Sequence, residues 1–184
     1  MHRFLEILLV VLVSLGLAGL APAADKAKPK ARPKPAAKAP KTLCKPDEWV
    51  VFGCQMLEGG KLLSVCASKD LGLKDGEVTG TIEYRFGRPG KVELTFPEGG
   101  LIVEGAFNFT RYTRPQDTML ALTFVNKGAK YEVYADYVGN DQAAGVRVTP
   151  VGKTEPIPLE CREPWVDEMM KLEDKGFAPP SDGE

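Results

Sequence analysis

The chain has 184 residues, of which 43% are hydrophobic, 8% aromatic and 27% charged, and its formal net charge is −1 at pH 7. This near-neutral value hides a division, because residues 24–42 carry +6 and residues 43–184 carry −7. An acidic folded part argues against nucleic-acid binding, and the single histidine, His2, argues against histidine catalysis once the first residues are removed.

Residues 1–23 have the pattern of a secretory signal peptide. A short basic start precedes an apolar run over 7–20 and small residues at Ala21 and Ala23, which predicts cleavage after Ala23. The alternative is an uncleaved anchor, although this run of 14 residues is short for a span of about 20. We therefore expect a periplasmic or secreted protein without a transmembrane anchor after cleavage.

Residues 24–42 contain seven Lys/Arg, four Pro and no large apolar side chain. Such a segment cannot bury a core, so it is expected to be a disordered basic linker. Its charge could attract an anionic surface such as phospholipid headgroups or cell-wall polymer, and the alternative is a plain spacer. Residues 43–176 then form one folded domain, and 177–184 are expected to be a loose tail.

Four cysteines in an exported chain predict two disulfides. The turn signal Gly59-Gly60 predicts a hairpin that places Cys54 opposite Cys66, within disulfide range. Cys44 would then pair with Cys161. The wide spacing of the cysteines is unlike the close pairs of a zinc site, so structural bridges are favoured over a metal centre or redox catalysis.

Alternating apolar and polar residues predict two strands over 78–86 and 92–96. We expect Phe86 to face Val92 and Arg85 to lie beside Glu93, because the alternative register opposes like charges. Residues 87–91 would form the loop between the two strands.

Further strands are predicted over 101–113, 118–125, 130–138, 144–151 and 155–161. The first of them should bury Leu101, Val103, Phe107 and Phe109. A two-residue loop at Lys127-Gly128 should set Phe124 opposite Tyr131. The prolines of the segment 155–161 favour an edge strand.

The predicted fold class is all-β: an antiparallel up-and-down barrel or sandwich of eight or nine short strands, with a short C-terminal helix. The helix is expected within 162–176 and should end at Gly176. Its apolar stripe would contain Trp165 or Val166, Met169, Met170 and Leu172.

Exposed tyrosines with polar neighbours predict a surface that binds a polypeptide or a glycan. Tyr112 and Tyr134 should both lie on solvent-facing sides of their strands. The alternative is that the terminal helix covers them, or that they are ordinary cross-strand residues without a binding role. The predicted surface consists of Glu104, Asn108, Thr110, Tyr112, Glu132, Tyr134 and Asp136.

The remaining motifs point to no cofactor and no metal. Serine is scarce and no glycine-rich phosphate loop is present. The segment 139–145 lacks the alternating acids of a calcium loop, and the sequon at 108–110 lies within a predicted strand. No catalytic residue is assigned, although a pair of carboxylates could still hydrolyse a glycan.

The stretches "VFGCQMLEGGKLLSVCAS" and "YRFGRPGKVELTFP" resemble a family of small secreted proteobacterial proteins that share a Cys-hairpin-Cys and a Tyr-Arg-Phe-Gly ribbon. The resemblance covers residues 44–96, extends to Cys161 and implies no activity. A looser likeness in architecture is to bacterial lysozyme inhibitors, which are also small disulfide-bonded β-domains.

These observations favour a non-enzymatic exported β-domain that binds an envelope glycan or an unidentified protein partner. Two alternatives are kept. The acidic domain could inhibit a basic cell-wall lytic enzyme, or two of its carboxylates could form a glycan hydrolase.

Overall fold

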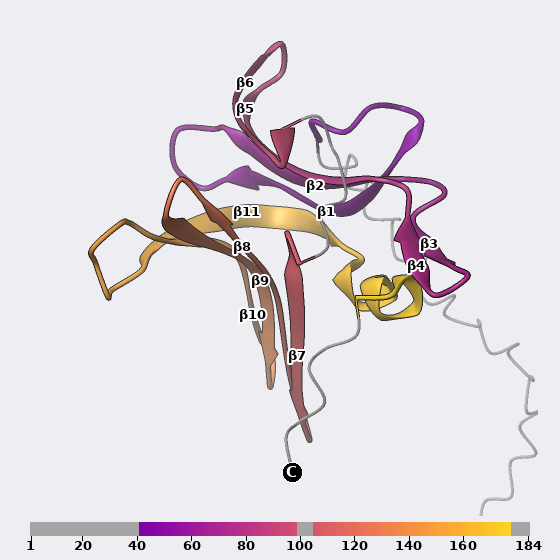
Figure 1. Cartoon of the computed structure of the whole chain (residues 1–184). Coiled ribbons are helices and arrows are strands. Elements are labelled where there is room, and N and C mark those ends of the chain that lie inside the picture. Colours follow the sequence, from indigo (N-terminus) through magenta and orange to yellow (C-terminus); the bar gives the residue numbers. More distant parts are fainter. Residues whose placement is uncertain (1–40, 99–104, 178–184) are drawn as a thin grey trace, which may run out of the picture. The chain divides into compact units, whose positions relative to one another are not determined.

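A computed structural model describes residues 41–98 and 105–177, which Figure 1 shows as coloured ribbons. The predicted signal peptide, nearly all of the basic linker and residues 178–184 lie outside the described residues. The same holds for Leu101, Val103 and Glu104. Within the two described ranges, no helix has the length and apolar character needed to cross a membrane.

The described residues form eleven strands and one 3-10 helix. Four strands form a first meander: β1 (Glu48–Met56), β2 (Leu62–Ser68), β5 (Ile82–Arg88) and β6 (Lys91–Phe96). A small separate hairpin, which the sequence did not predict, consists of β3 (Gly72–Lys74) and β4 (Glu77–Thr79). The remaining elements are β7 (Asn108–Arg114), β8 (Asp117–Asn126), β9 (Ala129–Val138), β10 (Asp141–Thr149), β11 (Ile157–Asp167) and η2 (Met169–Lys175).

Nine strands form one antiparallel sheet in the order β6-β5-β2-β1-β11-β10-β9-β8-β7, and this sheet is curled into a half-barrel. The long strand β11 connects the first meander to the meander β7–β10, as Figure 1 shows. The predicted all-β antiparallel fold with a short C-terminal helix is confirmed.

An aromatic cluster forms the centre of the core. The ring of Phe124 stacks on Phe96 at 4.5 Å and on Tyr131 at 4.9 Å, and its centroid lies 4.9 Å from that of Tyr84. These rings come from two pairs of neighbouring strands, β5 with β6 and β8 with β9, which lie toward opposite ends of the strand order. The curl of the sheet therefore brings its two ends together over shared apolar surface.

The β8–β9 hairpin has the predicted register, with Phe124 opposite Tyr131 across the Lys127-Gly128 turn. The predicted β5–β6 register is wrong. Phe86 faces Leu94 instead of Val92, and a bulge follows at Gly87.

Gly87 explains why the β5–β6 ladder shifts. Its φ is +146°, and a Cβ at this position would lie 2.6 Å from the carbonyl oxygen of Lys91. Only glycine accommodates such a close approach of two backbones. As a result, the loop is shorter than predicted and Arg85 faces Thr95 rather than Glu93.

The C-terminal segment also differs from its prediction. The strand β11 continues to Asp167, so Trp165 and Val166 belong to a strand and the helix begins only at Met169. The strand is central rather than an edge strand. The predicted end of the helix is confirmed, since Gly176 adopts a left-handed φ of 92°.

All four cysteines form disulfides as predicted, but the predicted pairing is wrong. The bonds join Cys44 to Cys66 and Cys54 to Cys161. The β1–β2 register is shifted by three residues from the predicted one, so Cys54 faces Leu63 instead of Cys66. Because side chains alternate along a strand, Cys66, three residues after Leu63, points to the other face of the sheet and cannot reach Cys54.

Candidate binding cleft

The strand β11 changes partners along its length, and this change opens a fork in the sheet. Residues 157–160 pair with β10, whereas residues 161–167 pair with β1. The pairing of β10 with β11 begins at Gly145, so residues 141–144 of β10 pair only with β9 in the described structure. Pro164, which lacks an N–H, lies at the irregular point of β11 where the β1 ladder is interrupted.

A cleft of about 310 Å³ occupies this fork. The strands β9, β10 and β11 supply its walls: Tyr137, Gln142, Glu163, Pro164, Trp165 and Asp167. Gln142 and Glu163 are exposed at the rim, whereas Tyr137, Trp165 and Asp167 are half-buried. The cleft thus combines two aromatic rings with an amide and two carboxyl groups.

Asp167 is held at both carboxyl oxygens. The hydroxyl of Tyr137 donates to Oδ2 at 2.8 Å, and the N–H of Met169 donates to Oδ1 at 3.0 Å. Burial raises the pKa of Asp167, and the two hydrogen bonds oppose this shift without cancelling it. Burial, followed by the hydrogen bond to Asp167, raises the pKa of Tyr137 to about 12.

The cleft lining is acidic, because two of its six residues carry carboxyl groups and none is basic. Two basic side chains on the neighbouring elements contact other groups: Arg162 donates to the carbonyl of Leu57 at 3.4 Å, and Lys171 pairs with Glu168 at 2.9 Å.

The predicted binding surface contains an internal cluster around Tyr134. This side chain lies on the expected side of the sheet, but it is only 3% exposed. The guanidinium of Arg147 covers its ring at 3.6 Å and contacts Glu132 at 2.8 Å and Asp136 at 2.5 Å. These three predicted site residues therefore lie together, but they use much of their binding capacity on Arg147, which the prediction did not include.

Apart from Glu104, which lies outside the described residues, the other predicted surface residues lie on β7. Tyr112 is 45% exposed, and the guanidinium of Arg114 lies 4.7 Å from its ring centroid. Asn108 is exposed and Thr110 is half-buried. These residues form a surface separate from the cleft lining, and their role in binding a partner stays a prediction.

A second concave region lies between the β1–β2 turn and β11. This apolar groove has a volume of about 480 Å³. Its lining consists of Met56, Leu57, Glu58, Gly59, Lys61, Phe86, Pro158, Leu159 and Glu160. Lys61 pairs with Glu93 at 2.6 Å.

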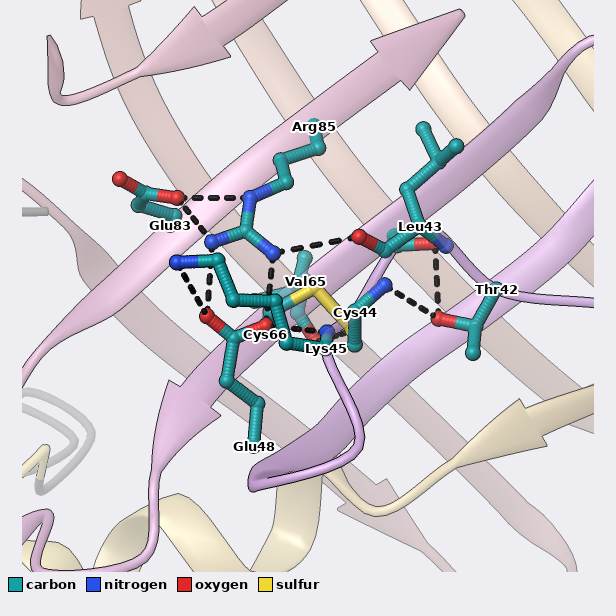
Figure 2. Close-up of a disulfide and its surroundings, with 10 residues drawn as sticks. Thr42, Leu43, Cys44, Lys45, Glu48, Val65, Cys66, Glu83 and Arg85 are labelled. Atoms are coloured by element: carbon teal, nitrogen blue, oxygen red, sulfur yellow. Dashed lines mark hydrogen bonds and ion pairs between the residues drawn. A yellow bond between two sulfur atoms is a disulfide. The ribbon is translucent and has the colours of Figure 1, made fainter. Parts of the chain in front are cut away.

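The cysteine pair near the beginning of the domain belongs to a structural cluster, which Figure 2 shows. Arg85 donates two hydrogen bonds to Glu48, at 2.6 and 2.8 Å, and a third to Glu83 at 2.6 Å. The hydrogen bond from Arg85 lowers the pKa of Glu48. Although Cys44, Glu48 and Cys66 are close together, both sulfurs are in a disulfide and offer no thiolate to a metal.

The predicted site residues did not include the cleft residues of β11, because the sequence of this segment fits both a helix pattern and a strand pattern. The apolar residues from Trp165 to Leu172 match a helical stripe, and Pro164 suits the first turn of a helix. The alternation of Glu163, Trp165 and Asp167 on one face was the signal for a strand.

Comparison of the chain with protein-family models, curated proteins and solved structures finds no match. The resemblance of residues 44–96 to small secreted proteobacterial proteins therefore stays a prediction. The binding properties of the cleft follow from the chemistry of its lining residues.

Proposed function

We propose that the protein is an exported, non-enzymatic binding module and that the cleft at the β10–β11 fork binds a glycan of the cell envelope. The observation that carries this proposal is the convergence of Trp165 and Tyr137 with Gln142 and two carboxyl groups in one cleft. Aromatic rings pack against the apolar faces of sugars, while amides and carboxylates hydrogen-bond to hydroxyl groups.

Export is supported by the two disulfides together with the predicted signal peptide. Disulfides form and persist in oxidising compartments such as the periplasm and the extracellular space. The protein would therefore meet envelope glycans where it folds. In this proposal the basic linker is a tether or spacer that keeps the domain near an anionic surface.

Binding is favoured over hydrolysis by the state of Asp167. A glycan hydrolase needs one carboxyl group to transfer a proton to the substrate and a second one across the scissile bond. Both oxygens of Asp167 accept hydrogen bonds from the protein itself. This carboxyl group is better placed to hold Tyr137 and the start of η2 than to exchange a proton with a sugar.

The two tryptophans of the chain allow a direct test. In Trp49→Phe, the only indole is that of Trp165 in the cleft, so titration with soluble peptidoglycan fragments should change the fluorescence. In Trp165→Phe, binding should weaken, and Trp49, which does not line the cleft, should give little signal.

Three results would overturn the proposal. The first is an unchanged Trp165 signal together with no sedimentation of the protein with purified sacculi. The second is release of new reducing ends, abolished by Glu163→Gln, which would favour the hydrolase. The third is inhibition of a lysozyme at micromolar concentration without any glycan binding, which would favour the inhibitor.

A further inference from the structure

The acidic residues of the cleft bear on which glycan it selects, an inference that rests on the proposed function. Glu163 and Asp167 place two carboxyl groups in one cleft, and no lining residue is basic. An anionic ligand would be repelled there, and a neutral one would leave the carboxylate of Glu163 without a charged partner. A cation would gain a charge-assisted contact with the carboxyl group of Glu163, which is exposed at the rim.

The aromatic residues of the cleft favour the same kind of ligand. Trp165 and Tyr137 line the cleft together with the two acids. A cation near an aromatic face is attracted by the electrons of the ring, most strongly by those of tryptophan. An ammonium group in the cleft could therefore contact the carboxylate of Glu163 and an aromatic ring together, while the ring faces remain suited to the sugar that carries it.

Among the described residues, three basic side chains on β10, β11 and η2 have partners of their own. Arg162 contacts the carbonyl of Leu57, Lys171 pairs with Glu168, and Arg147 is held by Glu132 and Asp136. Each of these basic side chains has a partner outside the cleft lining. None of these three side chains is therefore paired with the acids of the cleft.

We propose that the cleft selects glycan chains with free amino groups, binding glucosamine units in preference to N-acetylglucosamine units. The two sugars differ in charge and in one acetyl group, so the preference reports the contribution of the ammonium group. Glu163 is the specificity-determining residue, because it is exposed at the rim, whereas both oxygens of Asp167 already have donors.

The test compares a matched pair of oligosaccharides on the protein with both disulfides formed and Trp49 replaced by phenylalanine. Chitotetraose, which has free amino groups, and its fully N-acetylated form are titrated against Trp165 fluorescence at about pH 6, where exposed carboxyl groups are ionised. We expect chitotetraose to bind about tenfold more tightly, a typical gain from one charge-assisted contact.

Two variants assign the preference to the cleft. Glu163→Gln should reduce the preference to about threefold or less, since it removes one charge without changing the shape of the side chain. Glu155→Gln removes the same charge from the exposed turn between β10 and β11 and should leave the preference unchanged. If both variants lower it equally, the preference reflects overall charge and the inference is wrong.

The outcomes separate this inference from the proposed function. If the acetylated chain binds as tightly as chitotetraose or more tightly, the cleft is still a glycan site but the amino-group preference is refuted. If neither chain nor peptidoglycan fragments change the Trp165 signal, the proposed function fails and the inference fails with it. A preference that survives unchanged in Glu163→Gln would also refute the role given to this residue.

Discussion

Asp167 is a half-buried carboxyl group whose two oxygens accept hydrogen bonds from Tyr137 and Met169. The net effect of its surroundings is a raised pKa, with burial as the main cause. The folded state therefore holds this proton more tightly than the unfolded state does. Asp167 thus favours folding most at low pH, and this contribution is lost as the pH rises through its folded pKa.

The variant Asp167→Asn removes the ionisation and keeps the size and an oxygen that can accept from Met169. As the pH rises from 3.8, the ordinary pKa of the group, toward neutrality, the wild-type free energy of unfolding should fall relative to that of the variant. Urea unfolding at several pH values measures this difference. Asp70→Asn, at an exposed position, serves as the control, and a difference that is independent of pH would contradict the assignment.

Gly145 adjoins the fork, because the β10–β11 pairing begins there. A Cβ at this position would clash with the carbonyl oxygen of Leu159. Gly145→Ala should therefore push the two backbones apart and cost about 1–3 kcal/mol of stability, as overpacking does. It should also weaken ligand binding at the adjacent cleft.

Gly72→Ala is a matched control for Gly145→Ala. Its added Cβ would have only the distant carbon Cδ of Lys175 as a neighbour, at 3.9 Å, so it should change stability far less. Thermal unfolding of both variants gives the comparison. Equal stability of Gly145→Ala and the wild type would mean that the backbones separate without cost.

The strands and hairpins show where sequence patterns were sufficient. The β8–β9 register followed from alternation together with a two-residue turn, because a slip by one residue would place Phe124 and Leu122 on the face opposite to Tyr131 and Val133. The β5–β6 register was wrong because a bulge adds one residue to one strand while both flanking segments keep their alternation.

The site was harder to predict than the strands, because it depends on contacts between residues that are distant in the sequence. Its lining residues come from β9, β10 and β11 and meet only because β11 leaves β10 to pair with β1. A change of partner along one strand is a long-range event with no local pattern. The sequence indicated an acidic domain with aromatic binding residues. The predicted residues were Tyr112 and Tyr134, which do not line the cleft.

The two disulfides connect different pairs of elements, and their removal should have different costs. Cys44 and Cys66 are 22 residues apart, whereas Cys54 and Cys161 are 107 apart and join β1 to β11. In the chain-entropy model, these closures contribute about 3 and about 5 kcal/mol. Replacing Cys54 and Cys161 with alanine should therefore lower the denaturation midpoint more than replacing the other pair does.

The disulfide test has two readouts. Mass spectrometry of unreduced proteolytic peptides should recover the pairs Cys44–Cys66 and Cys54–Cys161. Urea unfolding of the two double variants then ranks the bridges. If removing the Cys44–Cys66 bridge lowered stability more, loop-closure entropy would not decide the ranking. The support that this bridge gives to the cluster around Arg85 and Glu48 would then be the larger contribution.

At the scale of the whole molecule, β11 and the aromatic cluster make the two meanders one folding unit. The strand pairs with β1 on one side and with β10 on the other, and Tyr84 and Phe96 of the first meander contact Phe124 of the second. Neither meander keeps its buried face when the other unfolds. If one meander unfolded alone, the apolar surface that the two meanders bury against each other would be exposed to solvent.

The protein should therefore unfold in one cooperative transition. Native-state hydrogen exchange measures this, because the slowest amides of β2 and of β8–β9 should exchange with the same free energy, equal to that of global unfolding. The small β3–β4 hairpin, which lies outside the nine-stranded sheet, should open at lower free energy and acts as the internal comparison. If β8–β9 exchanged at a clearly lower free energy than β2, the second meander would open alone, and β11 would be a hinge between two units instead of the strand that unites them.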